Sequence, residues 1–402
     1  MKMKILVICQ YYYPEPFRIT DICESLVLRG NEVTVLTGLP NYPEGRVLDE
    51  YRHGNKRKEV INGVEVIRCF EIGRGKSKTK LFLNYLSYTL SATLKAIFIK
   101  EEFDVVFVNQ LSPIFMGIPG IVYKKRHKKK LLLYCLDLWP DSLAAGGIKE
   151  TSAIFKIVYK ISKMVYSSAD SILVTSSMFI DYFKNELKSE INNIKHLPQY
   201  AEDIFTETRS KAAYSRVKNE RYNFVFAGNI GDMQSVETII KAAYELFDHN
   251  DIFFHIVGDG SKFNECKKLT SELSLKNVKF YGRKPIEEMP AFYELADAML
   301  ITLKDNKTLS YTLPGKVQSY MAAGKPIIGA ICGETQKVIE EAKCGFICKA
   351  EDYQALAKLI LKFCDSDETI LMGSNANKYY RENFDKNKFI DLLEKELMNL
   401  GA

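Results

Sequence analysis

Short apolar runs alternate with amphipathic stretches along most of this 402-residue chain. The runs are rich in Val, Ile and Leu on both faces, which is typical of parallel strands covered by helices. They occupy residues 4–9, 32–36, 64–69, 105–108, 130–136 and 171–174, and then 223–227, 252–257, 278–281 and 298–303. Helical patterns lie at 19–29, 236–247, 262–273 and 290–295. The alternation predicts an α/β fold with doubly wound parallel sheets.

The pattern breaks once, in the polar and charged stretch 201–220, which we interpret as an interdomain linker. The chain is long enough for two domains. We therefore predict domains at 1–200 and 201–384. The last stretch, 385–402, has the pattern of an amphipathic helix.

Composition narrows the class of protein. The hydrophobic fraction of 47% and the charged fraction of 26% are typical of a globular protein. Nine cysteines are scattered without the spacing of a metal site, and no signal peptide is visible, so we expect a cytoplasmic protein without a metal. The net charge of +6 is modest, and no nucleic-acid-binding motif accompanies it.

Two basic clusters, 74–80 and 124–130, flank a long apolar stretch at 81–99. The stretch approaches the length of a membrane span, but polar residues dilute it. A buried or interface-lying helix is the better interpretation, and its basic flanks suit the anionic inner face of the cytoplasmic membrane. A solvated basic rim beside a packed helix explains the charges equally well.

Glycine-rich turns follow three successive strands of the second half, at 226–234, 257–260 and 280–285. Gly228, Gly258 and Gly260 would let the backbone approach a ligand closely. Open α/β sheets bind ligands at the carboxyl ends of their strands. These turns therefore predict a binding site.

Residues 312–328 read as loop, helix, tight turn and strand. Pro314 and Gly315 open the helix. Lys316 lies in its first turn, where a cation opposes the helix dipole. A phosphate bound at this helix N-terminus would explain the lysine, because free N–H groups and the amine would then converge on one anion.

The stretch from Pro314 to Pro326 resembles the donor-nucleotide motif of family 4 retaining glycosyltransferases. The sequences A-G-N-I-G-x-x-Q at 227–234, Y-Y-P-E-P at 12–16 and G-L-P-N-Y-P at 38–43 resemble a subgroup that builds bacterial O-antigen and capsular polysaccharide. The resemblance covers essentially the whole chain. It implies the GT-B fold: two Rossmann-like domains facing a central cleft, with a C-terminal helix that crosses back to the N-terminal domain.

The resemblance also implies an activity. The enzyme would move a sugar from a UDP-sugar to a polyprenyl-diphosphate-linked saccharide at the cytoplasmic membrane face. The sugar would be an N-acetylated amino sugar such as N-acetyl-L-fucosamine. Family members are usually inferred to use a same-face mechanism, in which the leaving diphosphate helps to deprotonate the acceptor. That mechanism needs no divalent metal and no other cofactor.

Carried over residue by residue, the resemblance implies a donor site in the C-terminal half. Two positions that are Arg and Lys in many members are Asn229 and Gln234 here, and the paired glutamates are replaced by Tyr311 and Ser319. Lys316 then becomes the first candidate for stabilising the leaving diphosphate. The predicted donor residues are Gly228, Asn229, Gln234, Gly258, Gly260, Arg283, Lys284, Tyr311, Pro314, Gly315, Gln318 and Ser319.

The predicted acceptor side lies in loops after strands of the first half. Tyr12, Tyr13, Arg18, Asn41 and Trp139 are its binding candidates. Asp137 and Asp141 stand where many members have a histidine, and either could orient the acceptor hydroxyl or act as a base. For Asp141, capping of the following helix is an alternative. For the aromatic loop, packing on its own domain is an alternative.

Two other functions remain open from the sequence. A UDP-sugar epimerase shares the architecture, although the expected G-T-R-P-E motif is absent. A non-catalytic scaffold of polysaccharide assembly would account for the missing glutamates and loop cations. Fold alone does not separate these functions, because function depends on the site.

Overall fold

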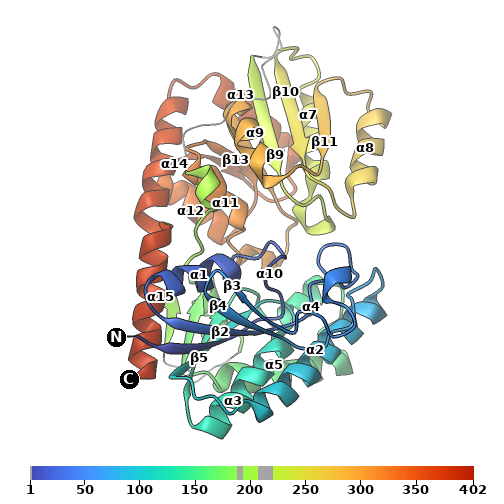
Figure 1. The fold of residues 1–402 in the computed structure, drawn as a ribbon. Coiled ribbons are helices and arrows are strands. Elements are labelled where there is room, and N and C mark those ends of the chain that lie inside the picture. Colours follow the sequence, from blue (N-terminus) through green and yellow to red (C-terminus); the bar gives the residue numbers. More distant parts are fainter. Residues whose placement is uncertain (1, 188–192, 207–220) are drawn as a thin grey trace. The chain divides into compact units, whose positions relative to one another are not determined.

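The computed structural model describes residues 2–187, 193–206 and 221–402 (Figure 1). It divides into two compact units. The N-terminal unit consists of residues 1–197 with 387–402, and the C-terminal unit consists of residues 198–386. Most of the predicted linker, residues 207–220, lies outside the described residues. Ala201 and Phe205, which we also assigned to the linker, are buried in the core of the C-terminal unit.

The N-terminal unit contains an eight-stranded sheet in the order β3-β4-β2-β1-β5-β6-β7-β8. All neighbouring strands are parallel except β3 and β4. Four central strands are almost fully buried, which explains their apolar runs. The strands are β1 (Lys4–Ile8), β2 (Glu32–Thr37), β3 (Lys58–Ile61), β4 (Val64–Arg68), β5 (Val105–Gln110), β6 (Lys130–Cys135), β7 (Ser171–Val174) and β8 (Ile194–His196).

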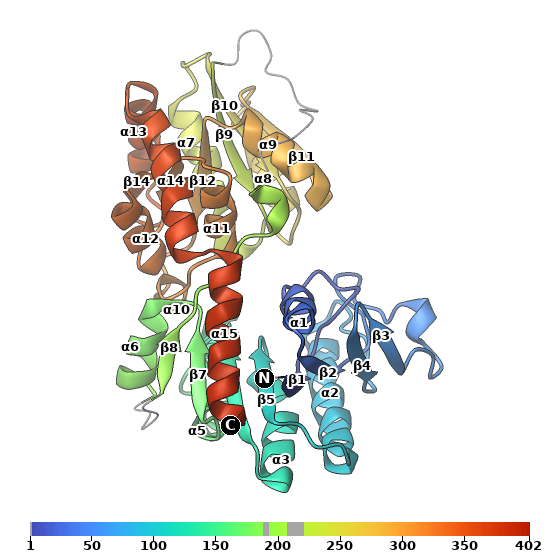
Figure 2. The same ribbon diagram turned by 60° about the vertical axis from the view of Figure 1, so that its left-hand side comes forward.

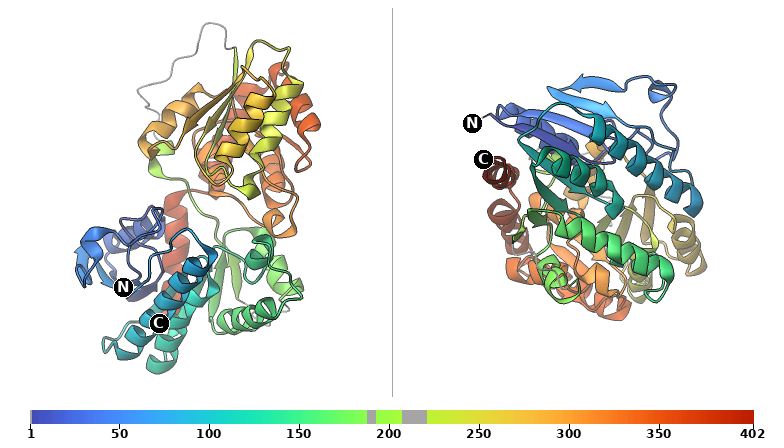
Figure 3. Two further views of the ribbon diagram at one scale, coloured as in Figure 1. Left: turned by 90° about the vertical axis from the view of Figure 1, so that its right-hand side faces the viewer. Right: turned by 90° about the horizontal axis from the view of Figure 1, so that it is seen from below.

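Helices cover both faces of this sheet. One face carries α1 and α6, and the other carries α2, α3 and α5 (Figures 2 and 3). The helices of this unit are α1 (Ile19–Leu28), α2 (Lys78–Phe98), α3 (Ile118–His127), α4 (Asp141–Ala145), α5 (Ala153–Ser167) and α6 (Ser177–Asn185), with short 3₁₀ turns η1 (Asp49–Tyr51) and η2 (Ile114–Gly117).

The last helix, α15 (Lys386–Gly401), belongs to the N-terminal unit for nearly its whole length. In Figure 2 it is seen between α1 and α6. Its buried Phe389 packs on Tyr134 of β6, with ring centroids 5.7 Å apart. Glu394 accepts a hydrogen bond of 2.6 Å from the side chain of Asn31, and Lys195 forms an ion pair of 2.5 Å with Glu396. The predicted return of the C-terminal helix to the N-terminal domain is confirmed.

The C-terminal unit contains a parallel six-stranded sheet in the order β11-β10-β9-β12-β13-β14. The strands are β9 (Tyr222–Ala227), β10 (Ile252–Val257), β11 (Val278–Gly282), β12 (Ala298–Thr302), β13 (Ile327–Ala330) and β14 (Gly345–Cys348). The three strands that precede the glycine turns are therefore neighbours, as the predicted binding site requires.

Two apolar clusters form the core of this unit, one on each face of its sheet. One lies under α7, α8 and α13, and the other under α9, α11, α12 and α14 (Figure 1). The helices are α7 (Val236–Glu245), α8 (Phe263–Glu272), α9 (Met289–Leu295), α10 (Lys307–Ser310), α11 (Gly315–Ala322), α12 (Glu334–Ala342), α13 (Tyr353–Cys364) and α14 (Thr369–Asn383), with 3₁₀ turns η3 (Asp203–Phe205), η4 (Asp232–Gln234) and η5 (Ile286–Glu288).

The architecture confirms the predicted GT-B class: two α/β units with parallel sheets and a returning C-terminal helix. Strands β3, β8 and β14 were not predicted. All three are short edge strands whose side chains are exposed or only partly buried, so they carry no buried apolar run. Among the described residues, no helix is long and apolar enough to cross a membrane.

Candidate functional site

Lys316 occupies the first turn of α11, and Pro314 is the N-cap of that helix. Its Nζ atom is buried and has no hydrogen-bond partner among the residues that the structure describes. The amine lies 4.0 Å from the ring centroid of Phe226 in β9. Burial lowers the pKa of Lys316 to about 7. A buried amine without a partner costs free energy, so this position is explained best by an anion that binds there.

Gly228 creates the space in which this amine lies. A Cβ atom at this position would stand 3.0 Å from the Nζ of Lys316, and the backbone has a φ of +143° that disfavours other residues. Tyr320 of the same helix fixes the preceding strand, because its hydroxyl bonds both the N–H and the carbonyl of Ala227, at 3.1 and 3.0 Å. The helix and the first glycine turn are thus held together as one structure.

The second glycine turn packs on the first without any space between them. A Cβ atom on Gly258 would lie 1.8 Å from the carbonyl oxygen of Gly228, and one on Gly260 would lie 2.5 Å from the carbonyl oxygen of Ile230. The backbone N–H of Gly228 donates to Val257, and that of Gly258 donates to Gly282, each at 2.9 Å. The glycines are therefore required by the contact of one turn with the next, and they leave backbone exposed at the carboxyl ends of the strands.

Asn229 and Gln234, the neutral replacements for the family cations, bond each other. The Gln234 Oε1 atom accepts from the Asn229 side chain at 3.1 Å and from the backbone N–H of Gly231 at 3.2 Å. Their role here is to shape the loop. A cation that the sequence did not point to lies close by: Lys304, two residues beyond β12, pairs with Asp232 of the loop at 2.9 Å.

The other predicted donor residues differ in their exposure and in their ion pairs. Arg283 is exposed after β11, and Lys284 pairs with Glu288 at 3.2 Å. Tyr311 ends α10 and is partly buried, while Gly315 is exposed at the N-terminus of α11. These residues follow strands or begin helices on the side of the sheet where the glycine turns lie.

Gln318 and Ser319, the predicted ribose contacts, both form hydrogen bonds at the start of α11. Gln318 is only 1% exposed, and its amide group donates to the Pro314 carbonyl of its own helix at 2.9 Å. Ser319 is buried, and its hydroxyl donates to the carbonyl of Gly315 at 3.3 Å. Both side chains stabilise the first turn of α11, because each satisfies a carbonyl within that helix. The structure corrects this part of the prediction for Gln318, whose side chain has almost no exposed surface.

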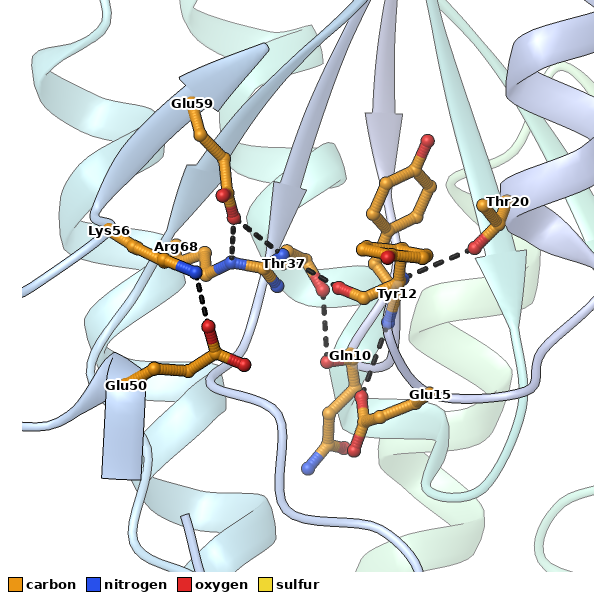
Figure 4. Close-up of polar contacts among 10 residues, drawn as sticks. Gln10, Tyr12, Glu15, Thr20, Thr37, Glu50, Lys56, Glu59 and Arg68 are labelled. Carbon is orange, nitrogen blue, oxygen red and sulfur yellow. Dashed lines mark hydrogen bonds and ion pairs between the residues drawn. The ribbon is translucent and has the colours of Figure 1, made fainter. Parts of the chain in front are cut away.

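In the N-terminal unit, the predicted aromatic loop after β1 is anchored by the buried Glu15. Its carboxylate accepts from the backbone N–H group of Tyr12 at 3.3 Å (Figure 4). It also accepts from the backbone N–H groups of Asn41 and Tyr42, at 2.9 and 2.7 Å. Arg68 of β4 donates to the carbonyl of Tyr13 at 2.6 Å. Burial raises the pKa of Glu15 to about 7. The loops after β1 and β2 are therefore joined through one carboxylate.

Tyr12 and Asn41 have other roles than the predicted acceptor contact. Both side chains are fully buried. Asn41 accepts a hydrogen bond of 3.0 Å from the backbone N–H of Arg74 and donates one of 3.3 Å to Glu71. They hold the loops in place, and the structure corrects the prediction for both. Tyr13, by contrast, is about half exposed.

A buried polar cluster around Glu71, which sequence reasoning missed, lies under these loops. The Glu71 Oε1 atom accepts from the side chains of Gln10, Asn84 and Asn41, while Oε2 is buried without a partner among the described residues. Burial raises the pKa of Glu71 to about 8. Glu71 follows β4 in a segment without a motif, so only the fold brings it to the other three residues.

Three aromatic side chains, Tyr11, Phe17 and Tyr42, pack together beside this cluster and are called the aromatic wall here. Tyr11 stacks on Phe17 with ring centroids 4.8 Å apart, and Tyr42 packs on Phe17 at 5.3 Å. The Arg74 guanidinium lies 5.6 Å from the Tyr42 ring. The Tyr11 hydroxyl is buried without a hydrogen-bond partner among the described residues. Aromatic faces beside polar groups suit a sugar ring, so Tyr11, Tyr42 and Arg74 join the candidates.

The remaining candidates follow β6, except Arg18, which is the partly buried N-cap of α1. Asp137 is hydrogen-bonded to Ser112, and burial raises its pKa. Trp139 is 5% exposed, with its ring centroid 6.1 Å from that of Phe115. Asp141 is the first residue of α4, whose N-cap is Pro140, and it accepts a hydrogen bond from Tyr182. The capping alternative for Asp141 therefore does not hold in the usual N-cap geometry.

Known proteins resemble this chain in sequence and in fold. Residues 208–383 match the family model described as glycosyl transferases group 1. A probable glycosyltransferase of Pseudomonas aeruginosa, WbjE, is 27% identical over 80% of this chain and 82% of its own length. The putative colanic acid biosynthesis glycosyl transferase WcaI of Escherichia coli K12 is 23% identical over the same shares.

Solved structures show the same fold. A sucrose-phosphate synthase from Thermosynechococcus elongatus superimposes with a TM-score of 0.78 at 16% identity, covering 99% of both chains. HepE from Anabaena, solved in complex with UDP, has a TM-score of 0.71 at 17% identity over 100% of both chains. The family model that matches the C-terminal half and the curated relatives indicate that this chain is a glycosyltransferase. The solved structures show that it has the GT-B fold.

Proposed function

We propose that this glycosyltransferase transfers a sugar from a UDP-sugar to a polyprenyl-diphosphate-linked saccharide during the synthesis of a bacterial surface polysaccharide. The observation that carries the donor half is the buried amine of Lys316, which has no partner among the described residues and lies at the N-terminus of α11 beside Gly228. A diphosphate supplies the missing counter-charge and also accepts from the free N–H groups of the helix.

The choice of UDP rests on a structural neighbour. HepE, which has the same fold over its whole length, was solved with UDP and with UDP-glucose. The choice of pathway rests on relatives named for colanic acid and teichuronic acid biosynthesis, in Escherichia coli K12 and Bacillus subtilis 168. For the sugar we keep the proposal of an N-acetylated amino sugar such as N-acetyl-L-fucosamine, which a donor panel would test.

The proposed chemistry is a same-face transfer with retention and without a metal. As the sugar leaves UDP, negative charge grows on the β-phosphate, and Lys316 with the N-terminus of α11 would stabilise that charge. Asp137 is the proposed partner of the acceptor hydroxyl. Among the described residues, no group of three or more His, Cys, Asp and Glu side chains is arranged to hold a metal ion. Metal independence itself stays a prediction, which activity in the presence of EDTA would test.

We further propose that α2 lies on an anionic membrane surface, where a polyprenyl-linked acceptor would be found. Large apolar side chains spaced four residues apart form an exposed stripe along this helix: Phe82, Leu86, Leu90, Leu94 and Phe98. Exposed lysines at 76, 78 and 80 stand at its N-terminal end. Such an amphipathic surface binds lipid through apolar burial and through attraction to anionic headgroups.

A thermal-shift screen of the full chain with UDP, GDP, CMP and a panel of UDP-sugars tests the donor proposal. A ligand that binds the native state raises the Tm by mass action. We expect UDP species to raise the Tm, and the preferred sugar to raise it most. If no nucleotide raises the Tm, the donor proposal fails and a scaffold role becomes the better explanation.

A further inference from the structure

Three residues from neighbouring strand ends of the N-terminal unit form a directed chain of hydrogen bonds. Ser112 follows β5, whereas Asp137 and Trp139 follow β6, and these two strands are paired. The indole Nε1 of Trp139 lies 3.0 Å from the Ser112 hydroxyl, which in turn contacts the Oδ2 atom of Asp137. Asp137 and Trp139 are site residues that the sequence predicts, whereas Ser112 is not.

The direction of this chain follows from the chemistry of its groups. An indole N–H can only donate, so the Ser112 oxygen must accept from Trp139. The serine has one proton, and the Asp137 carboxylate is its acceptor. Oδ2 of Asp137 therefore accepts the hydrogen bond from Ser112. Trp139 fixes the orientation of the Ser112 hydroxyl, because its indole N–H donates to the hydroxyl oxygen.

The second oxygen of Asp137 stays available. Oδ1 has no hydrogen bond to any described residue, and it is not among the buried atoms that lack a partner. Asp141, the other carboxylate of this loop, accepts a hydrogen bond from Tyr182 of α6. Asp137 is the aspartate whose bonded oxygen belongs to the chain from Trp139 through Ser112, and its Oδ1 is the oxygen left for a ligand.

The backbone around Asp137 is also held in place. Its carbonyl oxygen accepts from the Gln110 side chain at 3.1 Å and from the Tyr166 hydroxyl at 3.4 Å. The same tyrosine oxygen accepts from the backbone N–H of Trp139 at 3.1 Å. Side chain and main chain are thus fixed independently, which is what precise positioning of a reacting group requires.

We propose that Ser112 and Trp139 are positioning residues that hold Asp137 so that its Oδ1 accepts a hydrogen bond from the acceptor's attacking hydroxyl. This inference rests on the proposed glycosyl transfer and adds Ser112 to its site. Asp137 is the catalytic residue of the three, because it would touch the substrate. The ionised carboxylate is the form that accepts this bond, so activity falls when the pH drops through the pKa of Asp137.

The pH profile separates this role from a merely structural one. Burial raises the pKa of Asp137, and the hydrogen bond from Ser112 opposes that rise. Ser112→Ala removes the opposing bond, so the pKa of Asp137 should rise further. We expect the acid limb of kcat to move to higher pH in this variant, while Ser112→Thr, which keeps the hydroxyl, leaves it in place.

The assay measures UDP release from the preferred UDP-sugar with water as the acceptor, using the full-length chain. We expect Asp137→Asn to lower kcat about 100-fold with an unchanged affinity for UDP, because the lost interaction belongs to the transition state. An acid limb that is identical in Ser112→Ala and wild type would overturn the positioning role. Full activity of Asp137→Asn would overturn the catalytic role.

A measurement that needs no turnover distinguishes failure of this inference from failure of the proposed function. Carboxyl ¹³C resonances of aspartate-labelled protein are titrated, and Asp137→Asn identifies the Asp137 signal. We expect a higher pKa for this signal in Ser112→Ala than in wild type, and an equal pKa overturns the inference. A wild type that binds no nucleotide would contradict the proposed function, while the titration would still decide whether Ser112 controls Asp137.

Discussion

The loops after β9 and β10 and the loops after β1 and β2 occupy equivalent places, at the carboxyl ends of parallel strands, but they are built from different residues. In the C-terminal unit, glycine turns pack backbone against backbone, and a buried lysine without a hydrogen-bond partner stands beside them. In the N-terminal unit, the buried carboxylates Glu15 and Glu71 tie the loops together under an aromatic wall.

This difference in construction corresponds to a difference in the ligand that each set of loops suits. Exposed backbone and a cation without a counter-charge suit a diphosphate. Aromatic faces, amides and carboxylates suit the ring and hydroxyl groups of a sugar. This difference supports the proposal that the donor binds to the C-terminal unit and the acceptor to the N-terminal unit. Each of the following predictions tests one side of that proposal.

The largest effect is expected at the contact between the glycine turns. Gly258→Ala would place a Cβ atom 1.8 Å from the Gly228 carbonyl, at a backbone φ of +140°. Because a backbone atom cannot move aside cheaply, we expect a loss of about 3–5 kcal/mol in the free energy of unfolding. Chemical denaturation of the two proteins measures it.

Gly282→Ala is the matched control, because a Cβ atom there meets nothing within 4 Å although φ is +68°. The conformational cost alone is about 1 kcal/mol. Equal losses for the two alanine variants would show that the turns do not depend on close backbone contact.

Lys316→Met tests the cost of the buried amine. Because burial lowers the pKa of Lys316 to about 7 from its usual 10.5, the unfolded chain binds a proton more tightly than the folded protein does. The penalty is full below pH 7 and disappears as the pH rises towards 10.5. We expect the ligand-free methionine variant to be more stable than wild type at pH 6, by an amount on the order of a few kcal/mol.

At pH 10 that advantage should be much smaller, which thermal denaturation at the two pH values would show. A variant that is less stable than wild type at pH 6 would mean that the amine has a stabilising partner. In that case the replacement of Lys316 would not both stabilise the folded protein and impair its function, as the account expects.

Glu71→Gln tests the buried carboxylate of the other unit, where the sign of the pH dependence is reversed. Burial raises the pKa of Glu71 to about 8, so its contribution to stability is full below the unfolded value and is lost as the pH rises through 8. We expect the Tm of wild type to fall between pH 6 and 8.5 more than that of the variant.

The difference between the two proteins should amount to about 1–2 kcal/mol. Glu15 titrates in the same range, but it remains in both proteins and therefore cancels in the comparison. Glu59→Gln, on the partly exposed ion pair with Arg68, serves as the control. Parallel Tm curves for wild type and Glu71→Gln would contradict a buried, titrating Glu71.

The smallest effect concerns the exposed stripe of α2. Replacing Leu90 and Leu94 by Asp should weaken sedimentation with vesicles that contain anionic lipid by about tenfold. Glu substitutions at Leu28 and Ile370, which are each 87% exposed outside this helix, provide the control. Vesicle binding that is the same in all variants, or that does not weaken at high salt, would argue against this surface.

The sequence predicted most of this fold and only part of the site, for physical reasons. Buried parallel strands carry apolar runs, so the central strands and the division of the chain into two units were predictable. The half-exposed edge strands β3 and β8 carry no such pattern. The glycine turns and the start of α11 were predictable because backbone geometry restricts residue type there.

What the sequence did not predict depends on contacts between distant segments. Glu71 meets Gln10 and Asn84 only because the strands align their ends. Burial of Tyr12 and Gln318 was equally invisible, because a motif position does not say which way a side chain points. Ser112 lacked any motif, and only its neighbours Asp137 and Trp139 reveal its role.

The central claim is that Lys316 receives its counter-charge from a nucleotide diphosphate. Calorimetric titration of UDP into wild type and Lys316→Met at pH 7.5, in two buffers of different ionisation enthalpy, tests it most directly. The account predicts net proton uptake by wild type, because the bound diphosphate raises the pKa of Lys316. It also predicts binding about 100-fold weaker, with less proton uptake, for the variant. Equal affinities and equal proton uptake in the two proteins would contradict it.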